Sequence, residues 1–175
     1  MMQTITVKTA ELSPWPRNYN RHDERQITAL AASLRTFGQF KNIVVARRGG
    51  RLFTLAGHGL VEAAQRAGIA ELEAALAPDD WPDEKLEALL AADNRLAQLA
   101  QPDDALLAEL LQAVRAADAD LLPAVGFDSA EIDDLLRQVA AADEPPDVEF
   151  REYDETAADT VEWQQCPKCG CRWPK

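Results

Sequence analysis

The sequence predicts an α+β fold, in which a small mixed β-sheet with packed helices precedes an acidic helical extension and a short C-terminal cysteine knuckle. Three observations predict it. Short apolar runs typical of strands alternate with amphipathic helical segments over residues 1–80. Acidic segments rich in leucine and alanine follow over residues 81–142. After an acidic linker at residues 143–165, three cysteines mark residues 166–175 as the knuckle.

The first strand and the first helix are expected from their periodicity. Gln3–Lys8 alternates polar and apolar residues, as a strand with one buried face does. Residues 13–20 hold two prolines and two asparagines, which predict an irregular connection. A helix then begins near Asp23, a good N-cap, with Gln26 in the capping-box position, and it ends at Gly38.

The next segments complete the expected sheet. Ile43–Ala46 is β-branched and continuously apolar, as in a strand covered on both faces. Gly49–Gly50 predicts a tight turn into a second strand, Leu52–Ala56. A helix follows the glycines of Gly57–Gly59, and Leu72–Leu76 is a further candidate strand.

The acidic extension predicts three helices. Pro82 suits the first position of a helix, and Glu84–Ala100 is rich in leucine and alanine. A second helix is expected over Asp103–Ala116, and a third after Ser129, which is a candidate N-cap.

Composition limits the classes of protein. No run of eighteen apolar residues is present, so no membrane span is expected. The first ten residues lack a hydrophobic signal core, so we expect a cytoplasmic protein. Three clustered cysteines argue against a disulfide framework and for a reducing compartment.

Charge is distributed unevenly along the chain. Residues 1–70 hold ten of the 18 Lys and Arg but four of the 30 Asp and Glu, a net charge of +6 within a total of −12, which leaves −18 for the rest. A basic first part attracts phosphate-bearing partners. The alternative is that the basic and the acidic surface are both solvated and reduce each other's charge repulsion. The sequence does not decide between these two interpretations.

The loop Gly57–Gly59 is a candidate phosphate site. The first amides of a helix lack intrahelical partners, and the aligned peptide dipoles favour an anion there. Glycines allow close approach of a ligand to the backbone, and His58 can donate a further hydrogen bond. Many strand-to-helix turns carry glycine without any ligand, so the loop alone leaves this alternative open.

Several segments, in this order and spacing over about residues 3–138, resemble the ParB/sulfiredoxin-like domain. They are Leu12-Ser-Pro-Trp-Pro-Arg-Asn-Tyr-Asn-Arg21, Leu55-Ala-Gly-His-Gly59, Ala92-Asp-Asn-Arg-Leu96, and Gly126-Phe-Asp128 with the helix Glu131-Ile-Asp-Asp-Leu-Leu136. The most similar versions occur in phages, in mobile elements and in proteins fused to DNA methyltransferases.

The resemblance implies that the protein handles the phosphates of nucleotides or nucleic acids. In chromosome-partition members the loop that matches residues 57–60 reads Gly-Glu-Arg-Arg and grips a nucleoside triphosphate, so CTP or ATP with magnesium is implied. Arg21 matches the arginine of the family's entry loop. Leu60 stands where those relatives place an arginine and is expected to pack into the core, which weakens the triphosphate inference. Sulfiredoxins carry a cysteine in this loop; its absence here argues against sulfinic-acid reduction.

Asp93 interrupts the apolar stripe of the helix after Pro82. It lies seven residues after Leu86, almost in line with it, so we expect its carboxylate to be buried and partnered. In one interpretation Asp93, Asn94 and Arg95 face the phosphate loop, like a similar element that partition proteins use for nucleotide and magnesium. In the other, Asp93 is a structural bridge to Arg21 or to a helix N-terminus.

The cysteines predict a zinc knuckle. Cys166 and Cys169 have the spacing that presents two thiolates to a tetrahedral metal, and Cys171 offers a third. The fourth ligand is missing from this stretch. The alternative is a tail with three reduced thiols.

These observations favour a binding module over a catalyst. It would bind nucleotide or DNA phosphates in phage or mobile-element DNA metabolism, contact a protein partner through its acidic helices, and be open to homodimerisation. A basic helix-turn-helix is not evident, which argues against sequence-specific DNA reading. The alternatives are a metal-dependent NTPase or nuclease that uses Asp93 and His58, and an accessory partner of a DNA methyltransferase.

Overall fold

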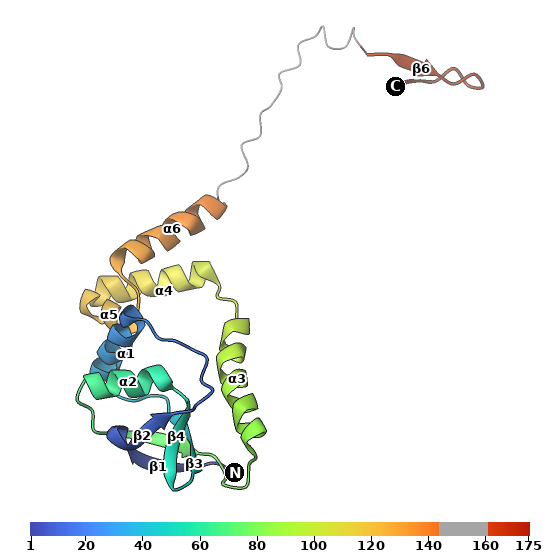
Figure 1. Cartoon of the computed structure of the whole chain (residues 1–175). Coiled ribbons are helices and arrows are strands. Elements are labelled where there is room, and N and C mark those ends of the chain that lie inside the picture. The colour runs from blue at the N-terminus through green and yellow to red at the C-terminus, as the bar shows by residue number, and fades with distance from the viewer. Residues whose placement is uncertain (144–160) are drawn as a thin grey trace. The chain divides into compact units, whose positions relative to one another are not determined.

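The computed structural model describes residues 1–143 and 161–175 (Figure 1). Residues 1–142 form one compact unit, and residues 161–175 belong to a second unit. The first unit contains a five-stranded mixed sheet in the order β1-β5-β3-β4-β2. Its strands are β1 (Gln3–Lys8), β2 (Leu12–Pro14), β3 (Ile43–Arg48), β4 (Arg51–Ala56) and β5 (Glu71–Leu76). The expected α+β architecture is confirmed.

Six α-helices belong to the described residues of this part of the chain. They are α1 (Glu24–Phe37), α2 (His58–Arg66), α3 (Asp83–Leu99), α4 (Asp104–Ala117), α5 (Leu122–Val125) and α6 (Ser129–Asp143), with short 3₁₀ turns η1 (Thr9–Glu11) and η2 (Ala119–Leu121). No helix of the described residues is both long and apolar enough to cross a membrane.

Strand β2 replaces the start of the predicted irregular connection. Leu12–Pro14 pairs in parallel with β4, and the Trp15 amide donates to the Thr54 carbonyl at 3.1 Å. The three residues of β2 are too few to show an alternation, and Pro14 is more typical of a loop than of a strand. Proline is tolerated there because β2 is the last strand of the sheet.

The central strand β3 is covered on both faces, as its sequence predicts. Ile43 and Val45 belong to the core under α1 and α2. Val44 and Ala46 belong to the core on the opposite face, where α3 packs. Successive strand residues point to opposite sides of the sheet, so a continuous apolar run contributes side chains to two separate cores.

Helix α3 packs on the sheet over its first half alone. Leu86 and Leu90 are buried against the sheet, whereas Leu96 and Leu99 are 65% and 55% exposed. The apolar residues of the second half of α3 therefore have no packing partner on the sheet.

Helices α4, α5 and α6 form a third small core around Leu111, Leu122 and Ile132, and α5 lies against α1. Ser129 is not the cap of α6. Instead, the Asp128 carboxylate accepts from the Glu131 amide at 2.9 Å, and the Glu131 carboxylate accepts from the Asp128 amide at 3.0 Å. This is a capping box one residue earlier than predicted.

The N-cap of α1 is the predicted one. The Asp23 carboxylate accepts from the Gln26 amide at 2.7 Å, and Gly38 ends the helix with a φ of 71°. The Gln26 side chain does not complete the capping box, because its oxygen contacts His22 Nδ1 at 2.9 Å. The side chain of Gln26 therefore contacts the imidazole of His22 instead of completing the capping box.

Ion pairs connect the basic first part of the chain to the acidic second part. Arg17 pairs with Glu87 at 2.6 Å, Arg48 with Asp83 at 2.8 Å, Arg47 with Asp79 at 3.5 Å, and Arg25 with Glu131. Four of the ten basic residues before residue 71 thus pair with acidic residues of the second part.

The second unit contains an antiparallel hairpin of β6 (Trp163–Gln165) and β7 (Arg172–Pro174), with the cysteines in its turn. Residues 144–160 of the predicted linker lie outside the described residues. The division into residues 1–80, 81–142, 143–165 and 166–175 stays a prediction.

Candidate functional site

The first turn of α2 is an open donor site. Strand β4 runs into Gly57, whose φ of 87° turns the chain into the helix. The Val61 amide donates to the Gly57 carbonyl at 3.0 Å, so the preceding amides have no partner within the helix. Asp23 and Asp103 cap α1 and α4, whereas α2 has neither a side-chain cap nor an acidic residue in its first turn.

Both glycines of this turn lie close to other side chains. A Cβ on Gly57 would lie 2.7 Å from Cγ2 of Ile43. A Cβ on Gly59 would lie 3.0 Å from Nδ1 of His22 and 3.1 Å from Cδ1 of Leu30. The close contacts at this loop are those of protein side chains, and the predicted approach of a ligand to the backbone stays a prediction.

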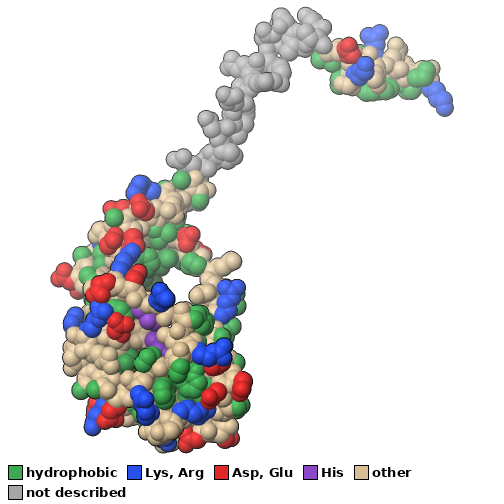
Figure 2. Space-filling model, in the orientation of Figure 1, with side chains coloured by type: hydrophobic (Ala, Val, Ile, Leu, Met, Phe, Trp, Pro, Cys, Tyr) green, Lys and Arg blue, Asp and Glu red, His purple; other side chains and the backbone are tan. Residues whose placement is uncertain are grey.

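A cavity of about 320 Å³ opens at the start of α2. It lies between that turn, the segment before α1, the α1–β3 loop and the middle of α3. The polar side chains that give it its chemistry are Asn20, His22, Lys41, His58, Asp93 and Asn94. Figure 2 shows the two histidines (purple) together on one face of the first unit.

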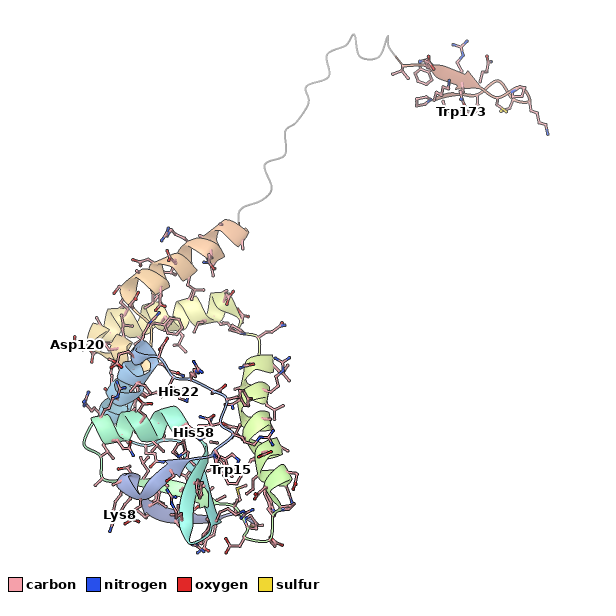
Figure 3. All side chains as sticks on the ribbon, viewed as in Figure 1. Lys8, Trp15, His22, His58, Asp120 and Trp173 are labelled. Carbon is pink, nitrogen blue, oxygen red and sulfur yellow. The ribbon has the colours of Figure 1, made fainter. Side chains whose placement is uncertain are left out.

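The two histidines come from different segments, one before α1 and one at the start of α2, and lie near each other (Figure 3). Burial lowers the pKa of His58, and the neighbouring His22 lowers it further. A hydrogen bond to the Thr54 backbone and the carboxylate of Asp93 act in the opposite direction. His58 Nε2 is buried and has no hydrogen-bond partner among the described residues. Burial is therefore the main cause of the lowered pKa of His58, and its Nε2 atom is left without a partner in the described part of the chain.

The structure brings together five of the predicted site residues and leaves two outside. Gly57, His58, Gly59, Asp93 and Asn94 line the cavity. Arg21 and Arg95 are exposed and do not line it. Residues 20–22 have no regular secondary structure, and Asn20 and His22 line the cavity while Arg21 between them does not. Along α3, each residue turns by about 100°, which carries Arg95 past the opening.

The prediction that Asp93 is buried and partnered is wrong. Its side chain is exposed, and it makes no hydrogen bond or ion pair with the described residues. The helical periodicity is correct, since Leu86 seven residues earlier is fully buried. The carboxylate stays in water because α3 has passed the edge of its packing surface at this point.

Leu60 behaves partly as predicted. It is half-buried and packs against the core formed with α1 and α2, yet it also lines the cavity. At the position where the similar family places an arginine, this chain therefore presents an apolar wall. The phosphate donors must come from elsewhere.

Sequence reasoning missed Asn20, His22, Lys41 and Asn42, which all line the cavity. Arg21 and His22 are neighbours in an irregular segment, which gives no periodic signal that separates them. For Lys41 and Asn42 no sequence signal exists, because a loop brings them to the site.

The lining suits an anion with an associated cation. Lys41 is the one Lys or Arg among the residues that line the cavity, and the open amides of α2 add fixed partial positive charge. Asp93 and the side-chain amides of Asn20 and Asn94 supply hard oxygen donors of the kind that Mg²⁺ takes together with phosphate oxygens. The donor set therefore fits magnesium bound with a polyphosphate.

The cysteines lie in the hairpin turn of the second unit. The Cys166 amide donates to the Cys171 carbonyl at 2.9 Å, and the Gly170 amide donates to the Cys166 carbonyl at 2.9 Å. A hydrogen bond from the Cys171 backbone, and then those with the thiols of Cys166 and Cys171, lower the pKa of Cys169. Over residues 1–143 and 161–175, no group of three or more His, Cys, Asp or Glu is placed to hold a metal ion. Zinc therefore gains no support and stays a prediction.

Solved structures share this architecture. The C-terminally truncated chromosome-partitioning protein ParB from Caulobacter crescentus, complexed with CTP-γ-S, aligns with a TM-score of 0.66 at 18% identity, covering 79% of each chain. The chain has the ParB/sulfiredoxin-like fold. The resemblance read from the sequence is thus confirmed at the level of the fold.

Two further structures align with the ParB-like fold more distantly. Sulfiredoxin from Arabidopsis thaliana has a TM-score of 0.42 and 18% identity over 50% of this chain and 97% of its own. The Caulobacter crescentus ParB complexed to the centromeric parS site has a TM-score of 0.44 and 17% identity over 81% of this chain and 73% of its own. No family model and no curated protein matches the sequence.

Proposed function

We propose that the ParB-like unit is a nucleotide-binding module that holds the phosphates of a nucleoside triphosphate at the start of α2. The observation that carries the proposal is that the uncapped first turn of α2 opens into the same cavity as Lys41 and both histidines. The similar ParB structure is a complex with CTP-γ-S, which makes CTP the first nucleotide to test.

The cavity favours a nucleotide over duplex DNA. Its volume of about 320 Å³ falls within the range of small-molecule sites, about 300–1,000 Å³. Duplex DNA needs an array of unpaired cations over a broad surface. Six of the ten basic residues before residue 71 make ion pairs instead, namely Lys8, Arg17, Arg25, Arg47, Arg48 and Arg66.

Lys41 is the residue whose removal tests the phosphate site. Calorimetric titration with CTP, ATP, inorganic tripolyphosphate and a short duplex DNA, each with and without Mg²⁺, identifies the ligand. Lys41→Gln is expected to raise Kd for the triphosphates about three- to tenfold, since an exposed charge is partly screened. Arg35→Gln is the matched control, because Arg35 is an exposed cation on α1 that does not line the cavity.

The outcome separates the candidate functions. Triphosphate binding that depends on Lys41 and not on Arg35 supports the proposal. Binding of duplex DNA alone, or equal effects of the two substitutions, contradicts it. Release of inorganic phosphate in the same samples, lost in Asp93→Asn, would instead favour the metal-dependent hydrolase.

The remaining expectations rest on the sequence. They are DNA binding, a role in phage or mobile-element DNA metabolism, a protein partner for the acidic helices, homodimerisation, association with a DNA methyltransferase, and a cytoplasmic location. Each stays a prediction.

A further inference from the structure

The loop between α1 and β3 is anchored by one side chain. The Gln39 amide nitrogen donates to the Glu73 carbonyl at 2.8 Å and to the Lys41 carbonyl at 3.1 Å. Its amide oxygen accepts from the Glu73 amide at 2.8 Å. Gln39 therefore pairs with the backbone of β5 as a neighbouring strand would, and it fixes the course of the loop before ligand arrives.

The residue after this anchor is an aromatic side chain left in water. Phe40 is 76% exposed, and it lines the cavity at the start of α2. It belongs to none of the three apolar cores, and it forms no aromatic pair with another described residue. An exposed phenyl ring that lines a cavity gains stability when a flat apolar surface covers it.

The cavity thus combines two kinds of recognition. The α2 amides and Lys41 suit a polyphosphate, whereas Phe40 suits the face of an aromatic ring. Asn20 and Asn42 add side-chain amides that can pair with the polar edge of such a ring. A nucleotide is the ligand class that carries both a polyphosphate and a flat ring with polar edges.

We infer that Phe40 is the platform on which the nucleobase stacks, an inference that rests on the nucleotide-binding function proposed above. Every base has a π-face, so stacking on Phe40 raises affinity for all nucleotides over bare tripolyphosphate. It does not select among bases. The side-chain amides of Asn20 and Asn42 select between CTP and ATP.

The test compares ligands with and without a base. In Phe40→Ala, Kd for CTP and ATP is expected to rise about five- to 150-fold, the loss associated with one base stacked on one aromatic ring. Kd for inorganic tripolyphosphate is expected to stay within about twofold, because the phosphate donors are untouched. Phe40→Tyr is expected to keep the affinity of the unchanged protein for both nucleotides.

Phe37→Ala is the matched control. Phe37 is a second exposed phenylalanine three residues earlier, and it does not line the cavity. Its substitution is expected to leave all three affinities unchanged.

Each result decides one claim. Nucleotide affinity that survives Phe40→Ala overturns the stacking platform and leaves the phosphate site intact. A parallel loss of tripolyphosphate binding also overturns it, since Phe40 would then merely shape the loop. If neither nucleotides nor tripolyphosphate bind the unchanged protein, the proposed function fails and the platform with it.

Discussion

Gly59 lies directly against the imidazole of His22: a Cβ at Gly59 would stand 3.0 Å from Nδ1 and 3.2 Å from Cε1. The contact joins the start of α2 to the segment before α1, at the centre of the candidate site. It explains why the second residue of α2 is a glycine in spite of the conformational entropy that glycine loses in a helix.

Gly59→Ala is expected to affect binding more than stability. Alanine gains about 1 kcal/mol of helix propensity over glycine, which offsets the cost of moving the imidazole by a few tenths of an ångström. The free energy of unfolding, measured in urea, should thus change by less than about 1 kcal/mol. Kd for the triphosphate should rise, because the imidazole moves within the cavity.

A double-mutant cycle with His22→Ala isolates this contact. Without the imidazole, Gly59→Ala should have little effect on Kd. An equal loss of affinity in both backgrounds would show that the methyl group itself blocks the ligand.

Gly57→Ala is expected to destabilise the protein by about 2–4 kcal/mol, from positive φ and overpacking together. The added methyl group would lie 2.7 Å from Ile43 Cγ2 at a φ of 87°. Gly50→Ala is the control for the backbone alone, because Gly50 has a φ of 75° and nothing lies within 4 Å of its Cβ position. Equal losses of unfolding free energy in the two variants would contradict the Ile43 contact.

His58 makes stability depend on pH. Burial lowers the pKa of His58 in the folded protein below the ordinary histidine value of 6.5, so the unfolded chain binds more protons near that pH. The contribution is fully present above pH 6.5 and is lost as pH falls through the lowered pKa of the folded state. In His58→Gln, urea midpoints between about pH 7.5 and pH 5 should fall less than in the unchanged protein. An identical slope in both proteins would refute the burial of a neutral imidazole.

Asp128→Ala is expected to destabilise α6 by about 1 kcal/mol, because it removes the acceptor for the Glu131 amide. Ser129→Ala should change the unfolding free energy by less than about 0.5 kcal/mol, because Ser129 does not cap the helix. Chemical denaturation of both variants checks the position of the capping box. If Ser129→Ala destabilised the protein more than Asp128→Ala, Ser129 would be the N-cap, as the sequence predicts.

The two halves of α3 should respond differently to truncation. Leu86→Ala is expected to cost about 2–5 kcal/mol, because Leu86 is fully buried against the sheet. Leu96→Ala and Asp93→Ala should each change the unfolding free energy by less than about 0.5 kcal/mol, since both side chains are exposed. A large loss in Asp93→Ala would mean that the carboxylate has a buried partner after all.

Local pattern was sufficient to predict most elements of the sheet and helices. The alternation of Gln3–Lys8, the continuous apolar run of Ile43–Ala46 and the cap at Asp23 each depend on residues close in sequence, and each matches the structure. The strand Leu12–Pro14 escaped detection because its pairing with β4 is a long-range property that three residues cannot signal.

The sequence predicts only part of the candidate site, because local patterns do not reveal contacts between residues far apart in the chain. Gly57–Gly59 is a local turn and was found where it lies. Arg21 matches the family's entry loop, but it does not line the cavity that Asn20 and His22 line. Lys41 comes from a loop whose course depends on the contacts of Gln39 with β5.

The fold class, most of the elements of residues 1–142 and the glycine turn at the start of α2 follow from the sequence, because periodicity, chain geometry and capping act over a few neighbouring residues. Tertiary structure alone decided which side chains line the cavity, and it left Asp93 in water. A helix stripe specifies which face is apolar, but only the extent of the sheet beneath α3 determines where that face stops being covered.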